Sequence, residues 1–231
     1  MISIINILKG SNEQNAGLNY LPNSRVIGSV GISKGKFYLI AFSLKTSTQN
    51  MPVLMSINAE DGLVVTPIVY TIINTATPLS PNYPQLTNVY KSISVYLYGG
   101  YCVSSNPNWD LTVTFGRCDF SSFAFSIDEV MGCTSSPIIQ SSSSKTNSTI
   151  LNNITPGNMT YLIGMSMLQN ESYPMNINPQ SIQISRCFDE SIVPNLISGY
   201  NSVGDINLGW SNGSEYPWLE KSTLACEIAS A

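Results

Sequence analysis

The chain has no histidine, and this absence removes several kinds of chemistry. Nucleophilic triads of the Ser-His or Cys-His kind cannot form, and no side chain has an ordinary pKa between about pH 5 and 8. The five cysteines form no CxxC pair, so the spacing of zinc sites is missing as well. We therefore expect no metal site, no cofactor and no enzymatic activity.

Charge is also scarce. Asp, Glu, Lys and Arg make up 10% of the 231 residues, against about 25% in an ordinary soluble domain. The net charge is -4 and the 10 basic residues are scattered, so the basic stripe of a nucleic-acid-binding protein is absent. A surface with few carboxylates loses little pairing energy when acid protonates them, which suits acidic surroundings.

Long apolar runs are missing too. No stretch of about 18 apolar residues is present, so the sequence predicts no membrane-spanning helix. The first residues, MISIINILKG, have no positive region ahead of a short, interrupted apolar run, which does not fit a secretory signal. We expect a chain that is made in the cytoplasm and left unprocessed.

What the sequence has in abundance is alternation with a period of two. SISVYLYGG, DLTVTFG and FSSFAFSID alternate as half-buried strands do. Further strands are predicted by runs rich in β-branched and aromatic residues: SRVIGSVGI, KFYLIAFSLK, PVLMSIN, LVVTPIVYTII, TYLIGMSML and SIQISRCF. Pro67 indicates an edge, a bulge or a break. No window has the periodic apolar stripe of a helix, and Pro194 opposes even a short one at DESIVPNLI.

Breaker-rich segments such as NAEDG, ATPLSPNYP and SSNPNWD separate the strands at intervals typical of Greek-key sandwiches. We predict an all-β protein with little or no helix, folded as an antiparallel β-sandwich with jelly-roll topology; an immunoglobulin-like sandwich is the open alternative. No internal repeat is visible. Residues 1–24 are expected to form an N-terminal arm or the first strand. Residues 25–231 are expected to form a single sandwich domain with a long polar surface loop near residues 141–160, broken by a short strand-like piece at STILNN.

All the cysteines are disulfide candidates. Disulfides suit an oxidising exterior or a hyperthermophile, and the alternative is free buried thiols packed as small apolar groups. Because the count is odd, at least one cysteine has no partner within the chain. The candidates are Cys102, Cys118, Cys133, Cys187 and Cys226.

Five Asn-x-Ser/Thr sequons mark candidate glycosylation sites. Chance gives about this number in a chain so rich in Asn, Ser and Thr, but all of them lie after residue 140 although Asn occurs throughout. The proline after Thr155 weakens Asn153 as an acceptor. Unmodified surface amides are the alternative. The candidates are Asn147, Asn153, Asn158, Asn170 and Asn212.

Carboxylates and tryptophans offer the remaining candidates for a site. Adjacent acidic pairs occur at Glu60-Asp61, Asp128-Glu129 and Asp189-Glu190. Neighbours in a strand point to opposite faces, so we expect solvation of loops rather than catalysis from these pairs. Trp109, Trp210 and Trp218 lie beside turns, where tryptophan caps the open end of a core or forms a sugar-binding platform, and we favour the core role.

Runs such as TNVYKSISVYLYGG and QSSSSKTNSTILNNIT, rich in strands and poor in charge, give the chain a style that resembles coat, turret and fibre proteins of viruses infecting archaea of hot acid springs. The resemblance covers the whole chain in composition and brings no functional residue with it. It implies a non-enzymatic virion subunit, in a capsid, turret or spike, that assembles with copies of itself or with other virion proteins and carries N-linked glycans on outer loops.

Two other functions remain open. The first is an extracellular pilus or thread subunit linked by donation of its N-terminal strand. The second is an acid-stable carbohydrate-binding module or carboxylate-dependent hydrolase.

Overall fold

The computed structural model consists of strands and their connections. It describes residues 1–15, 23–46, 54–58, 62–74, 92–115, 120–146, 148–166, 175–177, 182–187, 195–202, 205–210 and 221–231. These residues include no helix, and their paired strands are all antiparallel, which confirms the prediction of an all-β antiparallel fold. Each run predicted from alternation or β-branched composition overlaps a strand within the described residues.

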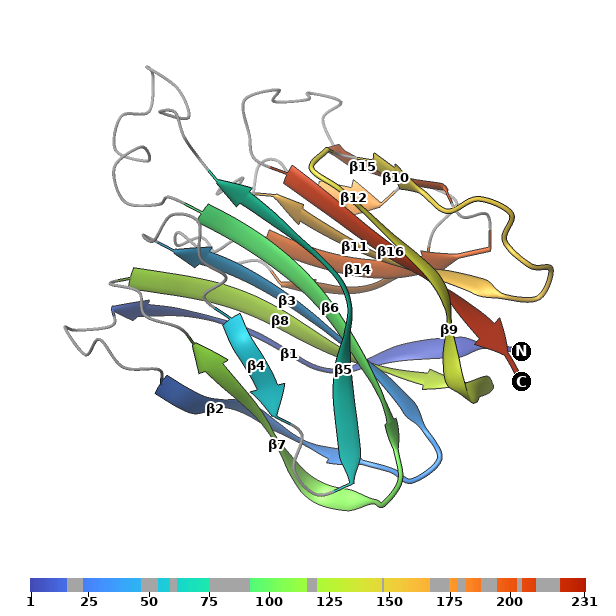
Figure 1. The fold of residues 1–231 in the computed structure, drawn as a ribbon, viewed down its shortest axis with the longest axis horizontal. Helices are drawn as coiled ribbons and strands as arrows, with labels where there is room; N and C mark the ends of the chain where they lie inside the picture. Colours follow the sequence, from blue (N-terminus) through green and yellow to red (C-terminus); the bar gives the residue numbers. More distant parts are fainter. Residues whose placement is uncertain are drawn as a thin grey trace.

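The described strands form four sheets stacked in layers (Figure 1). The N-sheet has the order β1 (Ser3–Asn15), β8 (Phe120–Met131), β3 (Phe37–Thr46), β6 (Ser92–Cys102), β5 (Leu63–Asn74). The outer N-sheet has the order β2 (Asn23–Ile32), β7 (Asn106–Phe115), β4 (Leu54–Asn58). The C-sheet has the order β13 (Ile182–Cys187), β14 (Asn195–Asn201), β11 (Met159–Ser166), β16 (Lys221–Ser230), β9 (Cys133–Ser144). The outer C-sheet has the order β10 (Ser148–Ile150), β15 (Asp205–Trp210), β12 (Met175–Ile177).

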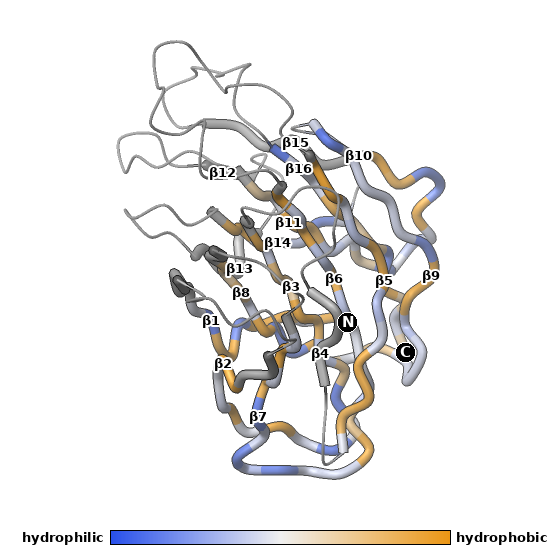
Figure 2. Tube along the Cα trace, turned by 60° about the vertical axis from the view of Figure 1, so that its left-hand side comes forward, coloured by the Kyte–Doolittle hydropathy of each residue, from blue (hydrophilic) through white to orange (hydrophobic). Residues whose placement is uncertain are grey.

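The N-sheet and the C-sheet pack face to face at the centre of the stack. One core cluster joins them, with Leu39 and Leu97 from the N-sheet and Ile163 and Leu224 from the C-sheet, all fully buried. A second core lies between the N-sheet and the outer N-sheet. A smaller apolar cluster lies on the outward face of the C-sheet. Hydrophobic colour follows β3, β11 and β14, whereas much of β9 is pale, as expected for an edge strand rich in serine (Figure 2).

The strand order of the first half of the chain recurs in the second. Adding eight to every strand number converts β1-β8-β3-β6-β5 into β9-β16-β11-β14-β13, and β2-β7-β4 into β10-β15-β12. The chain therefore divides at Gly132 into an N-terminal half, residues 1–131, and a C-terminal half, residues 133–231. The sequence, in which no repeat is visible and one domain is expected over residues 25–231, gives no sign of this division.

Local details recur along with the order. Gly35 and Gly157 sit two residues ahead of β3 and β11, with φ of 85° and 93°, a region that glycine enters without strain. A bulge skips Ile68 in β5 and Ile184 in β13, beside Leu97 and Ser198 of the neighbouring strands. Leu97 pairs with Ala41, and Ser198 pairs with Ile163. Ala41 and Ile163 are each the fifth residue of their strands, β3 and β11, so Leu97 and Ser198 occupy equivalent positions in the two halves.

All four edge strands of the two central sheets, β1, β5, β9 and β13, contain such a bulge. Pro67 lies directly beside the bulge of edge strand β5, which confirms the prediction made for it. Bulges and prolines twist an edge and remove donors, so these edges are poor templates for pairing with another chain.

Two predicted segments take definite places. The N-terminal residues form the first strand, since β1 pairs with β8 from Ser3 to Asn15. The polar stretch near residues 141–160 is not one loop: it contains the end of β9, the short strand β10 at the predicted STILNN piece, and the start of β11. The connection at 151–158 between β10 and β11 is its main irregular part.

Candidate functional site

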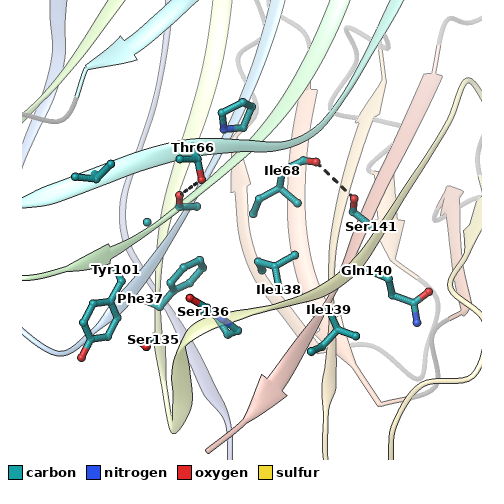
Figure 3. Close-up of a pocket in the computed structure, with 15 residues that line it drawn as sticks. Phe37, Thr66, Ile68, Tyr101, Ser135, Ser136, Ile138, Ile139, Gln140 and Ser141 are labelled. Carbon is teal, nitrogen blue, oxygen red and sulfur yellow. Dashed lines mark hydrogen bonds between the residues drawn. The ribbon is translucent and has the colours of Figure 1, made fainter.

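A groove of about 430 Å³ opens between the N-sheet and the C-sheet at one side of the molecule (Figure 3). Its walls come from β5 and β9, each an edge strand of its sheet. Ile68 of β5 and Ile138 of β9 face each other across it (Figure 3). At one end the Ser141 hydroxyl donates to the carbonyl of Ile68 at 3.5 Å, so side chain and backbone join the two strands there.

Among the described residues that line the groove none is charged, so these residues offer no carboxylate or amine for acid-base chemistry. Val64 and Ile139 in the lining are 69% and 57% exposed. The amide of Gln140 is committed elsewhere, because it donates to Glu227 and to the carbonyl of Asn152. The groove therefore offers exposed apolar surface at Val64 and Ile139 beside uncharged polar residues such as Ser135 and Ser136.

Between the two central sheets lies a buried carboxylate with four donors. Asp128 of β8 is fully buried. Its Oδ1 accepts from Asn6 Nδ2 at 2.8 Å and from the Ser126 hydroxyl at 3.0 Å, both in the N-terminal half. Its Oδ2 accepts from the Tyr161 hydroxyl at 2.6 Å and from the Ser198 hydroxyl at 2.9 Å, both in the C-terminal half. Each oxygen is thus satisfied by one half of the chain.

Burial decides the ionisation of this cluster. Removal from water raises the pKa of Asp128 above the ordinary 3.8, and the four hydrogen bonds oppose that rise without cancelling it. Burial, followed by the nearby Asp128 carboxylate, raises the pKa of Tyr161 well above 10.0. Tyr161 therefore remains a hydrogen-bond donor at all ordinary pH values.

Two further carboxylates hold equivalent loops on the outward faces of the central sheets. Glu129 accepts from the Tyr38 hydroxyl at 3.0 Å and lies 3.4 Å from Lys36 Nζ, at the turn between β2 and β3. Burial raises the pKa of Tyr38 to about 12, so it too stays a donor. The turn is fixed further by the Ser33 backbone N–H, which donates to Tyr38 at 2.8 Å.

Glu227, which is 1% exposed, does the same for the connection between β10 and β11. It accepts from Asn158 Nδ2 at 2.7 Å, the Thr155 backbone N–H at 2.9 Å and Gln140 Nε2 at 2.7 Å. Burial favours the neutral acid, but these bonds outweigh it and lower the pKa of Glu227 below 4.5. A carboxylate buried under a loop with three donors is a structural group rather than a reactive one.

These positions bear on the acidic pairs and tryptophans expected from the sequence. Asp128 and Glu129 point to opposite faces, as expected for strand neighbours, but both are structural and neither solvates a loop. Trp109 is 1% exposed and belongs to a core. The other pairs, Glu60-Asp61 and Asp189-Glu190, lie outside the described residues, as do the side chains of Trp210 and Trp218.

Three of the disulfide candidates are free thiols in the structure: Cys102 and Cys226, which are buried, and Cys133, which is half-buried. This corrects the disulfide prediction for these three in favour of its alternative. The physical reason is their separation. Cys102 lies in the core next to the outer N-sheet, whereas Cys226 lies in the core between the central sheets. Cys133 packs against the same core as Cys226 but pairs with Ser230, four residues further along β16, which is beyond the reach of a disulfide. Cys118 and the side chain of Cys187 lie outside the described part.

Some of the glycosylation candidates also lie within the described residues and others lie outside them. Asn158 is 8% exposed, its Nδ2 donates to Glu227 and its Oδ1 accepts from the Ser230 backbone N–H, so the structure disfavours the glycan predicted for it. Asn153 is exposed in the connection between β10 and β11. Asn147, Asn170 and Asn212 lie outside the described residues.

Sequence reasoning missed the groups that matter most in the structure, namely Asn6, Tyr161 and Ser198 around Asp128, and Gln140 beside Glu227. Each is a single polar residue in a strand, and only the pairing of distant strands brings them together. Among the residues that the structure describes, no three His, Cys, Asp or Glu side chains form a group able to hold a metal ion. The described chain also has no helix of the length and apolarity needed to cross a membrane.

Comparisons of the chain with protein-family models, with curated proteins and with solved structures find no match.

Proposed function

We propose that the protein is a non-enzymatic structural subunit of a virion, built from two jelly-roll units in one chain. The observation that carries the proposal is the repeated strand order. In a jelly roll of eight strands, one sheet has the order 1-8-3-6 and the other 2-7-4-5. The N-terminal half has β1-β8-β3-β6 and β2-β7-β4, and the C-terminal half has the same orders raised by eight.

The two halves depart from the ideal jelly roll in the same way. The fifth strand, β5 or β13, pairs with the sixth strand in the central sheet instead of with the fourth strand in the outer one. The shared departure supports treating the halves as two copies of one architecture. Jelly rolls occur in viral capsid domains, lectin domains and cupins, and the first of these supports a coat, turret or spike subunit.

The surface supports assembly through side chains. The outward strands carry many uncharged polar residues, and the groove between β5 and β9 can receive apolar side chains of a neighbouring subunit, either a second copy or another virion protein. The exposed Asn153 is the described position best placed to carry an N-linked glycan on the outside of a particle.

The two alternatives have less support. Strand donation needs a free N-terminal strand, whereas β1 pairs along its length with β8 of its own chain and the described sheet edges are bulged. A carbohydrate-binding module or hydrolase needs exposed tryptophan or clustered carboxylates in a cleft, whereas Trp109 is buried and the groove has no charged lining. Lectin jelly rolls keep the carbohydrate-binding function as the second candidate.

The test is direct imaging of the native source by electron cryomicroscopy, combined with mass spectrometry of purified particles. We expect the chain in a particle, with subunit contacts that cover Val64 and Ile139. A chain that stays monomeric at high concentration and is found in no particle would refute the proposal. Binding on a glycan array without particle association would favour the second candidate.

A further inference from the structure

The contact between the two central sheets has the form of an interface between two molecules. β1 lies against β13, and the equivalent strands β9 and β5 lie against each other; β8 lies against β13, and β16 against β5. Each of these contacts is thus matched by the one that exchanging the two halves would give, as in a two-fold dimer. A single residue, Gly132, links β8 to β9, and the Ala231 backbone N–H donates to its carbonyl at 3.0 Å.

The two sides of this interface differ in polarity around Asp128. Asp128 pairs with Leu39 within the N-sheet, and Cys226 pairs with Tyr161 within the C-sheet. Counting from the first pair of each ladder, Phe37 with Val130 and Met159 with Ile228, these are the third pairs, so Asp128 and Cys226 are equivalent.

The same count makes Tyr161 the equivalent of Leu39. Ser198 is the equivalent of Leu97, as their partners in β11 and β3 show. The N-terminal half therefore presents a carboxylate with two leucines, and the C-terminal half presents a thiol with two hydroxyls. All of these groups are fully buried.

This difference determines which pairings are favourable. When the N-terminal half meets the C-terminal half, Asp128 receives the Tyr161 and Ser198 hydroxyls at 2.6 and 2.9 Å. Two N-terminal halves would instead bury each Asp128 against the leucines of the other, with no donor from that side. Two C-terminal halves would bury the hydroxyls against a thiol. In a pair of N-terminal halves Asp128 would keep the Asn6 and Ser126 donors on Oδ1 but would have no donor on Oδ2. A buried carboxylate oxygen without a donor is unfavourable, so the like pairings are selected against.

We propose that the contact between the N-sheet and the C-sheet is a self-standing protein–protein interface, and that Asp128 is the specificity-determining residue that makes each half bind the other rather than a copy of itself. The partner of each half is the other half, and the link at Gly132 holds together two units that recognise each other without it. This proposal does not depend on the virion function.

The test begins with the full chain carrying a protease site between Ser135 and Ser136. These serines are exposed and lie between the register pairs Cys133 with Ser230 and Ile138 with Ile228, outside the ladder to β16. The folded protein is cleaved and examined by native mass spectrometry. We expect the two halves to remain together in a ratio of one to one. Halves that separate under native conditions would overturn the proposal.

The role of Asp128 is tested in the cleaved protein by Asp128→Leu, with Asp110→Leu at an exposed position of β7 as the matched control. Dilution of the native cleaved protein requires no refolding. The Asp128 variant is expected to dissociate at a concentration about tenfold or more above that of the control, because two buried hydroxyls lose their acceptor. After unfolding and joint refolding, it should also form pairs of N-terminal halves that the control does not form. Equal dissociation of the two variants would overturn the assignment to Asp128.

Discussion

Replacing Asp128 by asparagine is expected to remove the contribution of this carboxyl to stability, a contribution that falls as the pH rises. The folded state raises the pKa of this carboxyl above 3.8, mainly through burial, so the folded protein binds its proton more tightly than the unfolded chain does. Stability from this group is therefore fully present below the unfolded pKa and is lost as the pH rises through the folded one.

The size of the effect follows from linkage. Between the two pKa values one proton separates the folded from the unfolded state, so the free energy of unfolding falls by about 1.4 kcal/mol per pH unit. Asparagine has nearly the same size and cannot ionise. We expect it to be nearly neutral in strong acid, where Asp128 is protonated, and to stabilise the protein relative to the parent chain as the pH rises.

Urea denaturation of both proteins from about pH 3 to 7, followed by tryptophan fluorescence, to which the buried Trp109 contributes, measures this difference. The difference between the two curves isolates Asp128, because the other carboxylates are common to both. A difference that does not change with pH, or that shows the parent chain gaining stability relative to the variant as pH rises, would refute the reasoning.

Three further outcomes are expected. Glu227→Gln should cost about 1–3 kcal/mol at neutral pH and less in acid, because a carboxyl whose folded pKa is lowered contributes stability above its ordinary pKa and loses it as the pH falls; urea titrations at two pH values check this, and an equal cost at both would contradict it. Gly157→Ala should lower the thermal midpoint, because an alanine at φ 93° costs about 1–2 kcal/mol in backbone strain. The new methyl group would cause no clash, since its nearest neighbour is Ser230 Oγ at 3.7 Å, so the backbone alone accounts for the effect. An unchanged midpoint in calorimetry would argue against this. Glycopeptide mass spectrometry of native material should find any glycan of this connection on Asn153 and none on Asn158, whose amide is bonded to Glu227; a glycan on Asn158 would show that the connection opens.

The strands were predictable because their side chains report burial directly. In β6 and β8, apolar residues recur at every second position, and this period appears in the sequence without knowledge of the partners. β9 shows the limit of the method. Its run CTSSPIIQSSSS has few apolar residues because most of an edge strand faces solvent, so composition alone indicates a loop.

The repeat was not predictable for a related reason. Two segments have similar sequences, YLIAFSL at residues 38–44 and YLIGMSM at residues 161–167. The strand pairing nevertheless makes Leu39, not Tyr38, the structural equivalent of Tyr161. Tyr38 faces the outer N-sheet while Tyr161 faces the central interface. A shift of one residue moves every side chain of a strand to the other face, so the matching residues of the two similar segments lie on opposite faces of their sheets. The equivalence exists in pairing and turns, which a single sequence does not display.

The carboxylate cluster depends on contacts that are more distant still. Asn6, Asp128, Tyr161 and Ser198 come from four strands and from both halves of the chain. Each is an ordinary polar residue in its own segment, and no spacing rule connects them. The lack of histidine and of CxxC pairs in the sequence argues against catalytic triads and zinc sites. It does not show which polar residues meet in the interior.

Three positions lie close together in the structure: Met1, Gly132 and Ala231. This arrangement bears on the order in which the two halves are encoded. The two chain ends lie side by side (Figure 1), and the C-terminal residue is bonded to the residue that divides the halves. A circular permutant that begins at Cys133, passes from Ala231 into Met1 and ends at Gly132 would preserve every strand pairing described above. Nothing in the strand pairing therefore dictates which of the two halves a ribosome must make first.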